Sequence, residues 1–145
     1  MLPRWHILFG ALFTLLLWAF SPRIPLAYLA LTFAASVLID FDHYVCAAYR
    51  ERTLSFKKAL KYHRLQARAM EQKERRGLKP RSDFHLFHTL EFHVLIGVLG
   101  IFIVPFFYLF IGMVFHSLLD LYDGLRKNIV HRREYFFFNW LRERF

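Results

Sequence analysis

Long stretches without charge constrain this chain more than any other feature of its sequence. Trp5–Phe20 contains no Lys, Arg, Asp or Glu, and neither does Ile24–Ile39. Two more apolar stretches, Val94–Val104 and Phe106–Phe115, follow later and are separated by Pro105. Each stretch is somewhat shorter than the roughly 20 residues of a full membrane span. We therefore expect short membrane helices that are paired into two tightly turned hairpins.

The composition favours a membrane protein over a soluble helical bundle, which is the weaker alternative. Hydrophobic residues make up 57% of the 145 residues, and 18 of these are Phe. Soluble domains are about 45–50% apolar, and so small a domain has little interior in which to bury more. The single cysteine, Cys46, excludes an internal disulfide and a Cys-rich zinc module. No small-x-small cleavage site precedes Pro22, so we expect the first apolar stretch to be retained rather than removed as a signal peptide.

The predicted fold is all-α, a single membrane-embedded domain over residues 1–145. It has four short transmembrane helices in two hairpins and basic amphipathic helices at the cytoplasmic surface. The expected spans are approximately 5–20, 24–40, 86–104 and 105–121, with a basic cytoplasmic loop at 45–84 and an interfacial tail at 124–145.

The distribution of basic residues predicts the topology. With four spans, 19 of the 20 Lys and Arg residues lie on one side of the membrane, and only Arg23 lies on the other. Basic residues near membrane spans favour the cytoplasmic side. We therefore expect a multi-pass protein of the cell (inner, cytoplasmic) membrane with both termini in the cytoplasm.

The basic loop and tail are open to two interpretations. Both segments suit surface helices attracted to anionic lipid head groups, which is the favoured interpretation. The second and more specific interpretation is that the loop also binds the phosphate of a substrate. The candidate residues for this binding are Lys57, Lys58, Lys61 and Arg64. The sequence carries no nucleic-acid-binding module, so membrane lipids are the expected partners, and a homo-oligomer is left open.

Histidines and carboxylates gather where the apolar stretches meet the expected cytoplasmic surface. The candidates are Asp40, Asp42 and His43; His85, His88, Glu91 and His93; and His116, Asp120 and Asp123. Ionisable groups at such positions are costly and commonly mark function.

The spacing of these residues places them at matching depths. In a helical hairpin, residues equidistant from the turn lie at the same height. His88 and Asp120 are equidistant from the Val104–Pro105 turn, as His6 and Asp40 are from Arg23. The i, i+4 and i+7 spacing also puts His116, Asp120 and Asp123 on one helix face.

Mixed imidazole and carboxylate donors predict a divalent-metal site, with zinc favoured and manganese or iron as alternatives. The expected ligands are Asp40, His43, His85, His88, His93, His116 and Asp120, with His6 either a further ligand or an interfacial cap. More than four candidate ligands suit two or more ions. The competing interpretation is a buried polar network that caps the helices.

Three segments resemble the signatures of the small membrane-bound metal-dependent hydrolases, which include the LexA-binding, inner-membrane-associated hydrolases. They are Leu38–His43 (LIDFDH), Phe84–Thr89 (FHLFHT) and His116–Asp120 (HSLLD). Their order is also similar to that of the zinc-dependent phospholipase C and P1 nuclease superfamily. The resemblance implies a helical fold, a di- or trinuclear metal cluster and phosphoester hydrolysis.

The leading functional hypothesis is therefore a hydrolase that acts on a membrane lipid or lipid-linked phosphate through metal-activated water. Asp42, Glu91 and Asp123 are the candidates for a general base or for partners that orient the imidazoles. Alternatives are a non-catalytic metal-binding scaffold, a histidine-box di-iron oxidoreductase of lipids, and a b-type haem protein. The di-iron class fits less well because only His85 and His88 form a histidine-box pair, and the haem class fits less well because carboxylates accompany each group of histidines.

Overall fold

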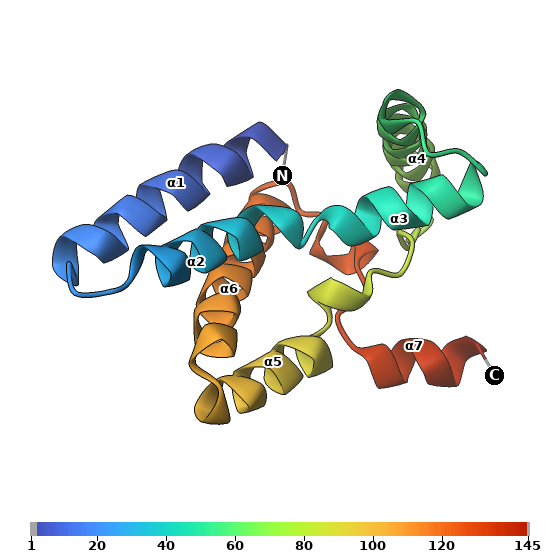
Figure 1. The fold of residues 1–145 in the computed structure, drawn as a ribbon. Coiled ribbons are helices and arrows are strands. Elements are labelled where there is room, and N and C mark those ends of the chain that lie inside the picture. The colour runs from blue at the N-terminus through green and yellow to red at the C-terminus, as the bar shows by residue number, and fades with distance from the viewer. Residues whose placement is uncertain (1–2, 145) are drawn as a thin grey trace.

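Helices form most of the computed structural model, which describes residues 3–144 (Figure 1). In chain order they are α1 (Pro3–Phe20), α2 (Leu26–Leu38), α3 (Phe41–Arg50), α4 (Phe56–Arg75), the 3-10 turn η1 (Leu86–His88), α5 (Leu90–Phe102), α6 (Val104–Arg126), the 3-10 turn η2 (Val130–Arg132) and α7 (Phe137–Arg144). The all-α class is confirmed, and no strand occurs between residues 3 and 144. Residues 1, 2 and 145 of the predicted single domain lie outside the described residues.

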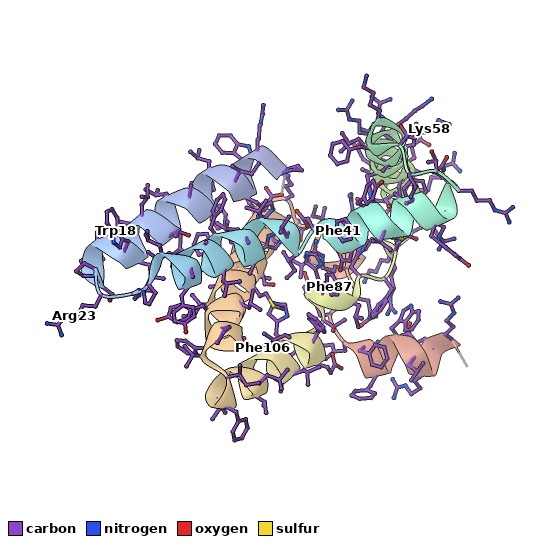
Figure 2. All side chains as sticks on the ribbon, viewed as in Figure 1. Trp18, Arg23, Phe41, Lys58, Phe87 and Phe106 are labelled. Carbon is purple, nitrogen blue, oxygen red and sulfur yellow. The ribbon has the colours of Figure 1, made fainter. Side chains whose placement is uncertain are left out.

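The first predicted hairpin is present as α1 and α2, which pack against each other. The chain reverses because Pro25 is extended (φ −56°, ψ 139°) and the Ile24 amide donates a hydrogen bond to the Ser21 carbonyl at 3.1 Å. Arg23 lies at the tip of this turn, at the far end of the hairpin (Figure 2).

The second hairpin, α5 and α6, is joined to the first by a close crossing of α2 and α6 (Figure 1). Gly112 makes the crossing close, because a Cβ atom there would collide with the Thr32 carbonyl oxygen of α2. The Thr32 hydroxyl donates to the Tyr108 carbonyl at 3.1 Å, and the rings of Tyr28 and Tyr108 stack with centroids 4.7 Å apart. Polar and aromatic contacts thereby fix the relative positions of α2 and α6.

Three helical segments are long and apolar enough to cross a membrane: Pro3–Phe20, Leu26–Arg50 and Val104–Arg126. The second runs through α2 and α3, so the helical segment extends past the predicted boundary at residue 40. Large apolar side chains such as Trp18 and Phe107 are exposed, and Trp18 lies on the outer face of α1 (Figure 2). These features are consistent with membrane association.

The structure does not confirm the third predicted span, 86–104. Thr89 interrupts it: its hydroxyl accepts a hydrogen bond from the Phe92 amide at 3.4 Å and so caps the beginning of α5. The remaining helix has 13 residues, a length of about 20 Å, whereas a hydrocarbon core is roughly 30 Å thick.

The C-terminal tail packs against the connection between α4 and α5. The Ser82 amide donates to the Arg132 carbonyl at 2.6 Å, and the Leu90 amide donates to the Tyr135 carbonyl at 2.9 Å. The ring of Phe84 stacks on Trp140 of α7 with centroids 4.2 Å apart. Contacts within the protein therefore hold the tail, in addition to any contact with lipid.

Candidate metal centre

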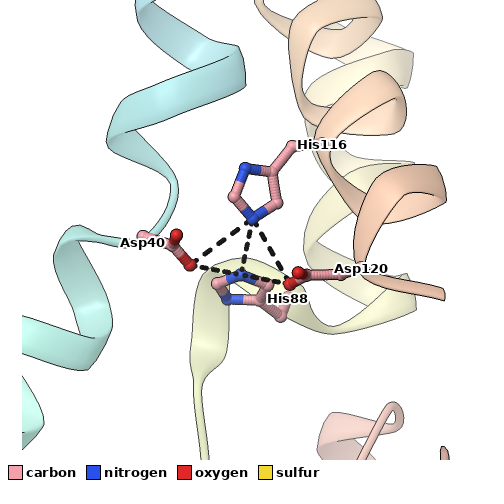
Figure 3. Close-up of side chains that lie close together, drawn as sticks. All are labelled: Asp40, His88, His116 and Asp120. Atoms are coloured by element: carbon pink, nitrogen blue, oxygen red, sulfur yellow. Dashed lines mark hydrogen bonds and ion pairs between the residues drawn. The ribbon is translucent and has the colours of Figure 1, made fainter. Parts of the chain in front are cut away.

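Four predicted ligands converge where α2, η1 and α6 meet (Figure 3). Asp40 lies at the break between α2 and α3, His88 ends η1, and His116 and Asp120 lie one turn apart on α6. One ligand atom from each lies within 4.8 Å of the others. α2 ends at Leu38 and α3 begins at Phe41, so Asp40 lies in the short break between them. Its side chain faces the other three residues (Figure 3).

Hydrogen bonds on the far side of each ring aim the two imidazoles inward. His88 Nδ1 lies 3.1 Å from Asp42 Oδ2, and His116 Nδ1 lies 2.8 Å from the Ser36 carbonyl oxygen. A proton on each Nδ1 satisfies these acceptors and leaves the Nε2 lone pair free for a metal. The two Nε2 atoms lie 3.4 Å apart.

The carboxylates complete a ring of acceptors around the same point. Asp40 Oδ1 lies 3.4 Å from Nε2 of His88 and 3.4 Å from Nε2 of His116. Asp120 Oδ2 lies 3.4 Å from His116 Nε2 and 3.9 Å from His88 Nε2. Lone pairs that face one another in a buried site repel unless a proton or a cation lies between them.

His6 joins this group from the first helix. Its ring stacks on His116 with centroids 3.9 Å apart, and its Nε2 lies 3.2 Å from Asp120 Oδ1 and 3.9 Å from Asp40 Oδ2. Only 1% of the residue is exposed, and within the described residues neither ring nitrogen makes a well-formed hydrogen bond, although Nε2 lies close to Asp120 Oδ1. An imidazole this deep, beside the carboxylate of a candidate ligand, is placed where a further ligand could lie.

A second donor group shares His88 and is formed by Asp42, His43 and His88. His85 borders it: its ring lies 3.6 Å from the ring of His43, and its Nδ1 is 3.8 Å from Asp42 Oδ1. Both of these atoms of His85 and Asp42 are buried without a hydrogen-bond partner in the described part of the chain. Burial lowers the pKa of His85 to about 4, although the Asp42 carboxylate acts in the opposite direction. The ring is therefore neutral at pH 7, which is the form that binds metal.

The donor set fits divalent metal. It combines imidazole nitrogens with carboxylate oxygens, as zinc, manganese and iron sites do. The buried and unpartnered atoms of His6, Asp42 and His85 surround the convergent groups, and each would gain a partner from a bound cation. The structure thus contains a buried His/Asp cluster that could hold a metal ion.

Three predicted site residues lie elsewhere. His93 Nδ1 is 2.9 Å from the Thr89 carbonyl oxygen, and its Nε2 is 2.9 Å from the Ser117 hydroxyl, so this residue joins α5 to α6. Glu91 accepts hydrogen bonds from the Phe137 and Phe138 amides and caps α7.

Asp123 is the third of these residues. Its carboxylate pairs with Lys127 at 2.6 Å, one turn further along α6. Neither donor group includes it.

The predicted phosphate-binding residues lie on α4, which packs on α3 away from the four-residue centre (Figures 1 and 2). Lys57, Lys58, Lys61 and Arg64 are all exposed. Lys58 points outward (Figure 2).

Sequence reasoning missed Arg133. Its Nη1 donates a hydrogen bond to Asp120 Oδ2 at 2.9 Å. The residue lies in the basic tail, where composition suggested contact with lipid, and no local spacing distinguishes it from its neighbours.

Comparison with protein-family models, curated proteins and solved structures found no match for this chain.

Proposed function

We propose that this protein is a metal-dependent phosphoester hydrolase that acts on a membrane lipid or a lipid-linked phosphate at the cytoplasmic face. The observation that carries the proposal is the buried donor group of Asp40, His88, His116 and Asp120. A bound divalent metal, with zinc favoured, would activate water and polarise a phosphoryl oxygen.

The donor residues differ in exposure, which favours one direction of substrate approach. His116 is completely buried and Asp120 is 5% exposed, whereas the side chains of Asp40 and His43 are 25% and 26% exposed. The centre is therefore most accessible along the Asp40–His43 side, near the break between α2 and α3. A lipid phosphate at the membrane surface would reach the centre from this side.

Residues around the centre have separate roles in the proposal. Asp42 Oδ2 accepts a hydrogen bond from the Phe87 amide at 3.0 Å and lies 3.1 Å from His88 Nδ1. Asp42 therefore holds both the η1 turn and the His88 imidazole in position. The remaining oxygen, Asp42 Oδ1, lies 3.8 Å from His85 Nδ1, and this carboxylate is the proposed general base. Asp40 and His43 line the open side.

Turnover of phospholipids and phosphomonoesters by metal-loaded protein in detergent or bilayers tests the proposal. The wild type should release phosphate or a phosphorylated head group, and His88→Gln should lower kcat by about 100-fold or more with a smaller change in KM. His131→Gln is the matched control, because His131 pairs with Glu74 at the protein surface. No turnover of any phosphoester by folded, fully metallated wild type would overturn the proposal and favour the metal-binding scaffold.

A further inference from the structure

One basic side chain reaches the metal centre. Within residues 3–144, Arg133 is the only Lys or Arg that forms an ion pair with a carboxylate of either donor group. Its partner atom, Asp120 Oδ2, is the same oxygen that faces the Nε2 atoms of His116 and His88. The guanidinium therefore contacts the carboxylate that faces both imidazoles of the four-residue centre.

Most of the hydrogen-bonding capacity of Arg133 is unused. A guanidinium carries five N–H donors in a planar fork. Among the described residues, the Arg133 side chain donates one hydrogen bond, to Asp120 Oδ2 at 2.9 Å. The side chain is 22% exposed, while that of Asp120 is 5% exposed. Arg133 thus lies between the buried ligands and the solvent, with donors available to an incoming anion.

The backbone on both sides of Arg133 is held in place. The Arg132 carbonyl accepts the Ser82 amide at 2.6 Å, and the Tyr135 carbonyl accepts the Leu90 amide at 2.9 Å. Arg132 itself binds Glu74 of α4 through Nε at 2.6 Å and through a second, shorter contact. Such positioning reduces the entropy that the side chain would lose on binding a ligand.

Asp40, Asp42 and Asp120 bring three carboxylates to the centre. One bound divalent cation would offset two of these three negative charges, so a further cationic group would assist the binding of a phosphate. Arginine suits the opposing role because its fork matches two phosphate oxygens at once. The lysines of α4, in contrast, are exposed.

We propose that Arg133 binds a phosphate oxygen of the substrate at the metal centre, held there by the pairing of the C-terminal tail with the α4–α5 connection. This role rests on the proposed phosphoester chemistry. It makes Arg133 a substrate-binding residue of that site, and it transfers phosphate recognition from the α4 lysines to the tail.

Binding of inorganic phosphate to metal-loaded protein, measured by calorimetry, tests the role without any need for turnover. Arg133→Gln should weaken phosphate binding by about 10- to 100-fold, the usual effect of one lost hydrogen bond to a charged group. Arg133→Lys should have an intermediate affinity, since it keeps the charge but loses the fork. Lys127→Gln, which removes a basic group from the same end of α6, should bind phosphate like the wild type. Metal content should be equal in all four proteins.

The outcomes separate this inference from the function on which it rests. Failure of metal-loaded wild type to bind phosphate would overturn both. Phosphate binding by the wild type that is unchanged in Arg133→Gln and Arg133→Lys would overturn the role of Arg133 alone. A loss of metal in Arg133→Gln, with unchanged phosphate affinity of the metallated fraction, would show that Arg133 only neutralises Asp120. Arg133→Lys provides the decisive comparison if Arg133→Gln does not fold.

Discussion

The imidazole of His6 lies flat against that of His116, with ring centroids 3.9 Å apart and planes inclined by only 13°. The first residue lies near the beginning of α1, and the second lies in the last third of the sequence. Both are almost completely buried. The contact brings α1 to the metal centre, although α1 packs mainly against α2.

A substitution that keeps this ring stack but removes the nitrogens can distinguish a ligand role of His6 from a packing role. His6→Phe keeps an aromatic ring on His116 but removes both ring nitrogens, and we expect the protein to fold and to bind zinc at least roughly 10-fold more weakly. Zinc titration against a competing chelator measures the change. His6→Ala should lose both the stack and the metal affinity. Wild-type zinc affinity in His6→Phe would show that His6 contributes packing alone.

Removal of two ligands of the four-residue centre should release metal. Purified wild type should hold at least one transition metal per chain, and the double substitution His116→Ala with Asp120→Ala should lose it, because half of that donor group is gone. Elemental analysis gives the metal content, and circular dichroism checks the helical fold. His131→Ala is the control. Full metal content in the folded double variant would favour the polar network, whereas a partial loss would indicate separate ions in the two donor groups.

Topology can be tested with single cysteines on a Cys46→Ser background. Lys61→Cys and Arg142→Cys should be labelled from the cytoplasmic side, and Arg23→Cys from the opposite side, as the positive-inside rule predicts. The structure adds a constraint: Lys61 and Arg142 must be labelled from the same side, because Arg132 of the tail binds Glu74 of α4. Labelling of these two residues from opposite sides would contradict the docking of the tail. Labelling of both from outside would reverse the topology.

The docking of the tail should weaken in acid. Hydrogen bonds from the Arg132 guanidinium hold the pKa of Glu74 below its ordinary value of 4.5. A carboxyl group with a lowered folded-state pKa stabilises the folded form above its unfolded pKa, and this contribution is lost as the pH falls through the folded value. Hydrogen-exchange protection of the Ser82 and Leu90 amides should therefore be constant above about pH 5 and decrease below pH 4.5.

Glu74→Gln provides the matched comparison for this pH dependence. In this variant, the hydrogen-exchange protection of the Ser82 and Leu90 amides should be weaker than in the wild type at neutral pH. This protection should decrease little further in acid, because the Gln side chain does not titrate. Equal acid sensitivity of the variant and the wild type would assign the effect to another group.

The sequence alone was sufficient to predict the helical class, three apolar helices and most residues of the buried His/Asp cluster. Helix periodicity and rise are local properties, so the spacing of His116 and Asp120 and their distance from a turn already indicate one face and one depth. Asp40 and His88 follow from the same reasoning. The predicted span 86–104 was not confirmed, since the Thr89 cap begins a new helix and leaves α5 too short.

Tertiary structure decided which of the remaining residues belong to the centre. His93 follows the Thr89 break, so its direction relative to His85 and His88 cannot be derived from a continuous helix, and it turns toward Ser117 instead. His6 and Arg133 reach Asp120 through the packing of α1 and the docking of the tail, contacts between segments more than ten residues apart. No local pattern distinguishes Arg133 from the basic residues around it. Its contact with Asp120 depends on how the tail docks in the tertiary structure, which residue spacing does not indicate.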